Sequence, residues 1–229
     1  MQAAFARERC FSADVAHELR TPIAELRSLS EVALKWPNGD GAATNSFQDT
    51  LDIAVQMQGI VDGLLAIARC ENGTQVSIRE PVRLAEVIQR SWKPFRERAA
   101  EKDLQVQLEL PESELQSVES DPAMLGLILS NLFSNAVEYT PAHGALSIRL
   151  QSDGSDFDLS VMNMSDNVTA DDVPHFFERF WRKDTARSSS QHSGIGLSVS
   201  HAFARALGFN LSAKLSENGL VQMTVANSK

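Results

Sequence analysis

The sequence predicts an all-α helical hairpin over residues 1–72, followed by an α+β two-layer sandwich over residues 73–229. Two observations indicate this division. Apolar residues recur at helical spacing through the first part and are interrupted once, by the turn-forming run at 36–41. After Gly73 the pattern changes to strand-like and helix-like segments in alternation, and a glycine at this place is a common end signal for a helix.

The hairpin is expected to form a dimeric four-helix bundle. Its first arm places apolar residues and Pro22 at alternating spacings of four and three from Val15 to Trp36, which is typical of a helix that packs along other helices. Its second arm has two adjacent apolar stripes, which are Phe47, Leu51, Ala54, Gln58, Val61, Leu65 and Ala68, and Ile53, Met57, Ile60, Leu64 and Ile67. A helix with two stripes needs more than one neighbour, and a lone hairpin supplies only one, so a second copy of the chain is expected to supply the other.

The second domain is expected to contain a mostly antiparallel sheet with helices on one face. The patterns predict strands near 76–79, 104–110, 145–151 and 157–163 and two closing strands, with helices over 84–99, after Asp121-Pro122 and over 196–207. Asp121 is a strong N-cap, and Pro122 is a favoured first helical residue. Strands that are interleaved with helices but joined in hairpins are typical of an α+β sandwich.

The composition disfavours several classes of function. With 43% apolar and 22% charged residues, the chain can bury a sizeable core. A formal net charge of −9 disfavours nucleic acid as a partner. Cys10 and Cys70 form neither a disulfide framework nor a metal motif, which favours a reducing, cytoplasmic location. We see no run of about 18 apolar residues and no leader peptide, so no membrane span or secretion signal is expected within this chain.

His17 is expected to stand on the exposed face of the first helix. It follows Val15 by two positions, a rotation of about 200° from the apolar seam, and Thr21 lies one turn further on the same face. Imidazole titrates near neutral pH and so offers an unprotonated nitrogen, as a nucleophile toward phosphorus requires. Glu18 can accept the proton of the other ring nitrogen. Pro22 should bend the helix at this point because it lacks an N–H.

The run FSADVAHELRTP at residues 11–22 resembles the H-box of sensor histidine kinases. The resemblance implies that His17 is the phospho-acceptor and that Glu18 is its acid–base partner. It also implies that Thr21 orients water when such a protein dephosphorylates its response regulator. An exposed histidine taken singly is more often an ordinary surface residue, so the assignment rests on the whole motif.

Two asparagines on the helix after residue 121 form a second group. Asn131 and Asn135 lie one turn apart on one face, and their amide oxygens are hard ligands of the kind that Mg2+ accepts. The run NLFSNAVEYT at 131–140 resembles the N-box of the same family. The resemblance implies that both asparagines and Tyr139 bind ATP, with Asn135 as the first choice for the metal and Asn131 as the second. Glu138 takes a place that is often basic in the family, so one phosphate contact is expected to be missing.

Asn163 is expected to contact the nucleotide base. Phe157, Leu159 and Val161 alternate toward one face of a strand, and Asn163 continues this row, where a polar side chain needs a partner such as an adenine amino group. The family's G1 motif has an aspartate followed by two glycines here, whereas this chain reads NMSDN at 163–167. A neutral amide forms a weaker hydrogen bond than a carboxylate, so reduced affinity for the nucleotide is expected.

A pair of glycines marks the start of the last predicted helix. Residues 193–197 (SGIGL) resemble the G2 box of the family, which implies that Gly194, Gly196 and Leu197 bind the nucleotide. A GxG pair alone is a weak signal, since such pairs occur in ordinary turns. Here the glycines open a helix, where backbone N–H groups can approach phosphates at the positive end of the helix dipole.

The segment before these glycines is expected to be a nucleotide lid. Residues 164–193 are too many for a plain connection between two elements. Within them, the run PHFFERFWR at 174–182 resembles the F-box of the family. Arg179 and Arg182 are candidates to neutralise phosphate charge, although surface arginines are equally common at such places.

Together these motifs imply a sensor histidine kinase core with a Bergerat-type ATP-binding sandwich. The implied reaction is autophosphorylation of His17 from ATP with Mg2+, transfer to an aspartate of a response regulator receiver domain, and dephosphorylation of that regulator. The implied protein is a homodimer joined through the hairpin and is the cytoplasmic portion of a bacterial inner-membrane sensor, anchored by a segment upstream of this chain. The altered G1 motif leaves an alternative, a regulator-binding, phosphatase-dominant module with weak ATP use. Gyrase-type ATPases share the pocket but lack the hairpin.

Overall fold

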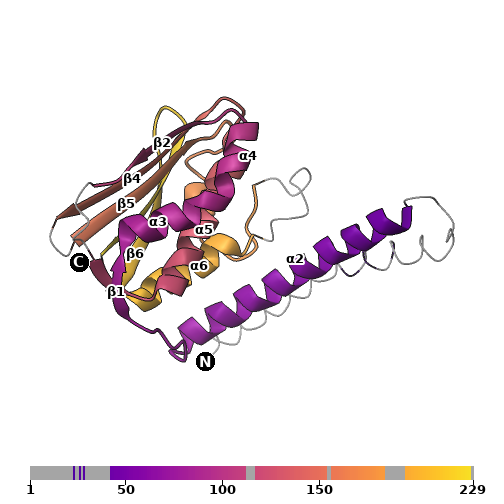
Figure 1. Ribbon diagram of the computed structural model, residues 1–229, viewed down its shortest axis with the longest axis horizontal. Coiled ribbons are helices and arrows are strands. Elements are labelled where there is room, and N and C mark those ends of the chain that lie inside the picture. The colour runs from indigo at the N-terminus through magenta and orange to yellow at the C-terminus, as the bar shows by residue number, and fades with distance from the viewer. Residues whose placement is uncertain are drawn as a thin grey trace.

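The computed structural model describes residues 23, 26, 28, 42–111, 117–153, 156–183 and 194–227. The predicted residues His17, Glu18 and Thr21, and most of the first arm of the hairpin, lie outside this part of the chain. The second arm is helix α2, Ala42–Glu71. Figure 1 shows α2 as a long helix beside a domain that is built of a sheet and shorter helices.

Helix α2 ends where the sequence predicts. Its last residue is Glu71, the Asn72 N–H donates to Ala68 O at 3.0 Å, and Gly73 has a φ of 65°. This left-handed conformation is readily adopted by glycine and ends the helix. The chain then enters the second domain through an extended stretch in which the Val76 side chain is 79% exposed.

The second domain has a five-stranded sheet in the order β2-β4-β5-β7-β6. The strands are β2 Gln105–Glu109, β4 Ala145–Asp153, β5 Asp156–Met164, β6 Phe209–Leu215 and β7 Leu220–Asn227. Strands β2 and β4 are parallel, and the other neighbouring pairs are antiparallel. A small antiparallel sheet pairs β1, Glu80–Arg83, with β3, Ser117–Ser120.

Helices cover one face of the large sheet (Figure 1). They are α3 Leu84–Trp92, α4 Arg96–Glu101, α5 Pro122–Tyr139 and α6 Gly196–Leu207, with the 3-10 helices η1 Lys93–Phe95 and η2 Val173–His175. The core between helices and sheet includes Leu125, Ile128 and Phe133 of α5 and Leu159 and Val161 of β5, none of which is more than 1% exposed. The expected two-layer α+β sandwich is therefore confirmed.

Three local predictions are corrected by the structure. The strand predicted at 76–79 occurs later, as β1, because the Ile78 N–H donates to Asp121 Oδ2 at 2.9 Å and only the residues from Glu80 onward pair with β3. Strand β3 was not predicted. The helix predicted over 84–99 is divided at η1, where Pro94 lacks the N–H that a continuous α-helix would use.

One segment of α2, Ile53–Glu71, is long and apolar enough to span a membrane by length and composition. This corrects the expectation that the chain contains no such segment. In the structure, Ile60, Leu64 and Ile67 of this segment are buried in the core cluster, at 1%, 7% and 3% exposure. Helix α2 packs along α6 (Figure 1), so contacts within the protein account for these three side chains, whereas only 18% of the segment is buried.

Candidate functional site

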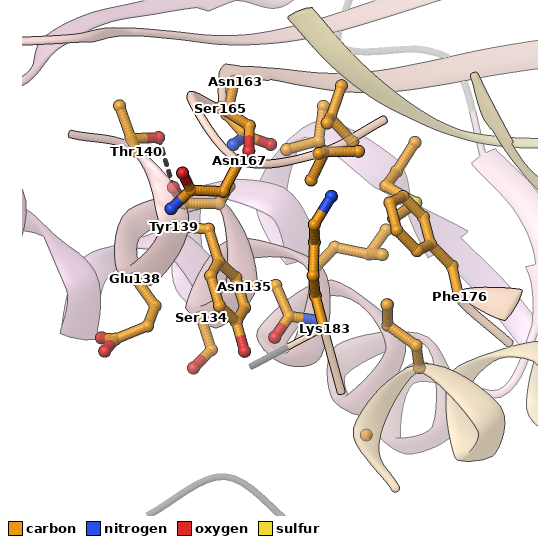
Figure 2. Close-up of a pocket in the computed structure, with 18 of the residues that line it drawn as sticks. Ser134, Asn135, Glu138, Tyr139, Thr140, Asn163, Ser165, Asn167, Phe176 and Lys183 are labelled. Atoms are coloured by element: carbon orange, nitrogen blue, oxygen red, sulfur yellow. Dashed lines mark hydrogen bonds between the residues drawn. The ribbon is translucent and has the colours of Figure 1, made fainter. Parts of the chain in front are cut away.

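A pocket of about 760 Å3 lies between α5, strands β5 and β7, the start of α6 and the segment that follows β5 (Figure 2). Its lining includes most of the predicted nucleotide-binding residues, namely Asn131, Asn135, Tyr139, Asn163, Arg182, Gly194, Gly196 and Leu197. Arg179 is not part of the lining. Residues from four separate motifs thus meet at one cavity in the described part of the chain.

Helix α5 is positioned by the cap at its first turn. Asp121 Oδ1 accepts hydrogen bonds from Ala123 N at 2.9 Å and from Met124 N at 3.0 Å. The same carboxylate binds the linker after α2, so it fixes both the start of α5 and the entry of the chain into the domain. With the start fixed, the apolar residues of α5 face the core, and Asn131 and Asn135 face the pocket.

Asn131 joins α5 to α6. Its Nδ2 donates to Gly196 O and to Ser200 Oγ, both at 3.0 Å. A Cβ atom on Gly196 would lie 3.4 Å from Asn131 Oδ1, so the two helices approach closely here. Because the amide nitrogen is used between the helices, only Oδ1 of Asn131 is left for a ligand.

Asn135 is better placed than Asn131 to hold a cation. Its amide makes no hydrogen bond to any described residue, and it lies beside Tyr139 in the pocket (Figure 2). Mg2+ takes oxygen ligands and commonly keeps waters and substrate phosphates as its other ligands, so one protein oxygen is a fitting contribution. No cluster of three His, Cys, Asp or Glu side chains suited to a metal occurs within the described ranges. The donor set therefore fits a Mg2+ ion that arrives with a nucleotide.

Asn163 is buried in the sheet wall of the pocket. Its side chain is 6% exposed, and the residue pairs in register with Leu146 of β4 and Val221 of β7. Its Nδ2 donates to Met164 O at 3.0 Å. The alternating row that precedes Asn163 in β5 faces the core as predicted. The amide thus lies where that row meets the cavity.

Gly194 and Gly196 shape the start of α6. Gly194 has a φ of 68°, and a Cβ atom there would meet the Phe180 backbone at 2.8 Å. The Phe180 N–H donates to Gly194 O at 3.0 Å, which joins the two ends of the segment between them. Helix α6 begins at Gly196 without a side-chain cap. Its first N–H groups therefore remain available, and the positive end of the helix favours an anion at the pocket.

Two lysines that the sequence analysis did not single out also line the pocket. Lys102 Nζ donates to Val137 O and to Glu138 O, both at 2.8 Å, at the C-terminal end of α5. Burial lowers the pKa of Lys102, and the negative charge of Glu138 partly offsets that effect. Lys183 extends into the pocket from the segment after β5 (Figure 2). No sequence pattern could have identified either lysine, because both reach the pocket through tertiary packing.

Ion pairs surround the pocket. They join Arg98 to Glu138, Lys183 to Asp172 and Arg179 to Glu71. Asp172 Oδ2 also accepts hydrogen bonds from the N–H and the hydroxyl of Thr169, both at 2.7 Å. The hydrogen bond from Lys183 is the main cause that lowers the pKa of Asp172 to about 2, and the hydrogen bonds from Thr169 come second. Arg179, which was predicted to face phosphate, is paired with the last residue of α2.

Helix α2 contacts the same glycine-rich turn from the other side. A Cβ atom on Gly63 would lie 2.7 Å from Ile195 Cγ2 and 3.2 Å from Val199 Cγ2. Ile195 stands between the two glycines at the start of α6 and is 2% exposed. The second arm of the hairpin is therefore packed directly against the element that closes one end of the pocket.

Two regions of the chain match known domain families. Residues 7–73 match the His Kinase A (phospho-acceptor) domain, and residues 120–226 match the histidine kinase-, DNA gyrase B-, and HSP90-like ATPase family. The class defined by these matches joins a helical phospho-acceptor domain to an ATPase domain. The fold and the pocket described above agree with that class.

One relative supports the same assignment, and two solved structures share the fold. Sensor histidine kinase CusS of Escherichia coli K12 is 32% identical over 196 residues, which cover 85% of this chain and 40% of the relative. Histidine kinase AdeS of Acinetobacter baumannii shares the fold, with a TM-score of 0.75 at 22% identity over 93% of this chain and 97% of that one. Histidine kinase ThkA, in a complex with response regulator protein TrrA, has a TM-score of 0.71 at 20% identity over 97% of this chain and 64% of that one.

The chain belongs to the sensor histidine kinases of two-component systems. It spans about two fifths of the length of the relative CusS. The expectation of a histidine kinase core, made from the motifs, is thereby confirmed. The roles of the individual site residues remain predictions, which the geometry above makes specific.

Proposed function

We propose that this chain is a kinase core that transfers the γ-phosphoryl group of ATP to His17. The observation that supports this most directly is the pocket, in which the asparagines of α5 and β5 meet the glycine turn at the start of α6. The match to the phospho-acceptor domain spans residues 7–73 and includes His17. A triphosphate fits this combination because backbone N–H groups, lysines and an amide oxygen for Mg2+ line one cavity.

The transfer proceeds by displacement at phosphorus. The unprotonated ring nitrogen of His17 attacks the γ-phosphorus, a P–N bond forms, and the bond to the β-phosphate oxygen breaks with its electron pair on ADP. Glu18 takes the proton of the other ring nitrogen. Asn135, with Asn131 as second candidate, would hold a Mg2+ ion, which would neutralise charge at the phosphates. In the second step an aspartate carboxylate of a response regulator takes the phosphoryl group from His17.

The proposed homodimer is supported by the two apolar stripes of α2. Ile60 and Ile67 of one stripe are buried against the second domain, at 1% and 3% exposure. Val61 and Leu65 of the other stripe are 43% and 48% exposed within a single chain. An exposed apolar stripe along a hairpin helix is covered when two hairpins form a four-helix bundle.

The partner and the location follow from the family. We infer that the phosphoryl acceptor is a receiver domain, since the neighbour ThkA was crystallised in a complex with a response regulator protein. We place the core on the cytoplasmic side of a membrane-anchored sensor by analogy with the sensor histidine kinases that it resembles, such as CusS. Dephosphorylation of the regulator, with Thr21 orienting water, belongs to the same proposal.

The proposal is tested by incubation of the purified chain with Mg2+ and γ-labelled ATP. We expect an acid-labile label on the native chain and none on His17→Gln. The matched control is His143→Gln, since His143 is a histidine of the catalytic domain whose side chain is 76% exposed. The control should be labelled like the native chain. Label that persists in His17→Gln would contradict the assignment of His17.

A second candidate function is favoured by the neutral amide at Asn163. A phosphatase-dominant module would use ATP weakly and would mainly remove phosphate from its regulator. In the same assay, such a protein would take up little label while it still dephosphorylated a phosphorylated receiver domain. Thr21→Ala should then abolish the dephosphorylation.

A further inference from the structure

The sheet wall of the pocket contains a patch that is apolar except for one amide. Val161 faces Met223 across β5 and β7, Asn163 faces Val221, and all four line the pocket. None of the four is more than 7% exposed. A flat apolar wall with one buried polar group suits a heteroaromatic ring whose edge forms a hydrogen bond to that amide.

The amide of Asn163 is only partly used by the protein. Its Nδ2 donates to Met164 O at 3.0 Å, and no described residue donates to its Oδ1. Asn163 Oδ1 is therefore an acceptor at the surface of the pocket, and the 6-amino group of a purine supplies a donor for it. An amide also carries donors, and a half-turn about its terminal bond exchanges oxygen and nitrogen with little change of shape. A carboxylate at this position could only accept.

We infer that Asn163 lets the pocket bind purine triphosphates whose base carries a 6-oxo group, in addition to ATP. This inference rests on the proposed function as an ATP-binding kinase. With ATP, the amide keeps the orientation seen here, and Oδ1 accepts from the 6-amino group. With a 6-oxo purine, the amide turns so that Nδ2 donates to the base oxygen. Its Oδ1 then faces Met164 O, so the hydrogen bond seen here is lost and the two acceptors must move apart, which the edge of the strand after Asn163 has to allow. The loss of one neutral hydrogen bond corresponds to a preference for ATP of less than about tenfold.

An aspartate at position 163 gives the opposite expectation. Its ionised carboxylate has no hydrogen-bond donor. Two acceptors, the carboxylate and the 6-oxo group, would then face each other in a buried place. Binding sites discriminate strongly when the wrong ligand leaves a buried polar group unpaired, by about 10⁴-fold in the most selective cases. We therefore expect the variant Asn163→Asp to raise the preference for ATP at least about tenfold above that of the native chain.

The test is a calorimetric titration of the native chain and of Asn163→Asp with ATP and with ITP, each with Mg2+. The expected ratio of Kd for ITP to Kd for ATP is below about tenfold in the native chain and at least about tenfold larger in the variant. Asn163→Ala removes both hydrogen-bonding groups, so it should weaken both nucleotides and bring the ratio close to one. This second variant is informative even if a buried carboxylate prevents Asn163→Asp from folding, which circular dichroism reports.

The outcomes separate this inference from the proposed function. A native ratio above about tenfold, or the same ratio in the native chain and in Asn163→Asp, overturns the inference. If ATP still binds in that case, the kinase proposal stands. A native chain that binds neither nucleotide contradicts both.

Discussion

The floor and the rim of the pocket are held together by different forces. The floor, formed by α5, β5 and α6, rests on apolar side chains such as Phe133, which is 0% exposed. We define the rim as residues 165–183. It is held by the ion pair of Asp172 with Lys183 and by the ion pair of Arg179 with Glu71 at the end of α2. Burial of apolar surface is insensitive to pH, whereas ion pairs near the surface are weak and are screened by salt.

This difference indicates which part of the site is preformed. The floor keeps the spacing of the asparagines and the glycine turn because its side chains are closely packed. The rim can shift at low cost when a nucleotide enters, since only weak contacts must be broken. Ring contacts between Trp181 and both His175 and Phe176, with centroids 6.2 and 5.4 Å apart, keep the rim together as a local unit.

The largest effect is expected from a cavity in the floor. The Phe133 ring meets Trp92 edge to face, with centroids 5.5 Å apart, and has no exposed surface. Phe133→Ala should lower the free energy of unfolding by about 3–5 kcal/mol, because burial is lost and a cavity is left. Urea unfolding followed by circular dichroism measures this. Leu127→Ala on the same helix is the control, since Leu127 is 53% exposed, and its effect should stay within about 0.5 kcal/mol.

An intermediate effect is expected where α2 meets the floor. A Cβ atom on Gly63 would lie 2.7 Å from Ile195 Cγ2, whereas one on Gly59 would have no atom within 4 Å. Both Gly→Ala changes gain about 1 kcal/mol of helix propensity, so the difference between the two variants isolates the crowding. Gly63→Ala should be less stable than Gly59→Ala by about 1–3 kcal/mol and should show faster hydrogen exchange in α2. Equal stability of the two variants would contradict the packing of α2 on α6.

The smallest effect is expected in the rim. The pKa of Asp172 is about 2 in the folded protein, below its ordinary value of 3.8. Its contacts therefore stabilise the folded state fully above about pH 4, and this contribution is lost as the pH falls toward 2. Lys183→Met should return the pKa partway toward 3.8, as a titration of the carboxyl signal by NMR would show. Lys214→Met, at an exposed lysine of β6, should leave the pKa of Asp172 unchanged.

Local chemistry was sufficient to predict the parts of the site that lie on regular elements. Asp121 and Pro122 predicted the start of α5, and the cap is formed as expected. A helix with a known start places Asn131 and Asn135 on one face without any long-range information. Strand alternation likewise predicted the burial of Asn163, because side chains point to alternate faces of a strand.

Contacts between distant segments could not be predicted in this way. Strand β3 was missed because it is short and pairs with β1, which comes much earlier in the chain. Arg179 was predicted to face phosphate from its motif, yet its guanidinium is paired with Glu71 and lies outside the pocket lining. Lys183, by contrast, belongs to none of the sequence motifs, yet its side chain reaches the pocket. The direction of a long charged side chain depends on which opposite charge the fold brings near it.

The sequence by itself determined the end of α2 near Gly73, the start of the pocket helix, and the burial of Asn163 at the sheet wall of the cavity. These features depend on periodicity, capping and alternation, which act between residues close together in the chain. The tertiary structure alone decided which cations surround the pocket and that Gly63 of α2 packs against the turn at Ile195. Such contacts join segments that are far apart in sequence, so they exist only once the helices have packed on the sheet.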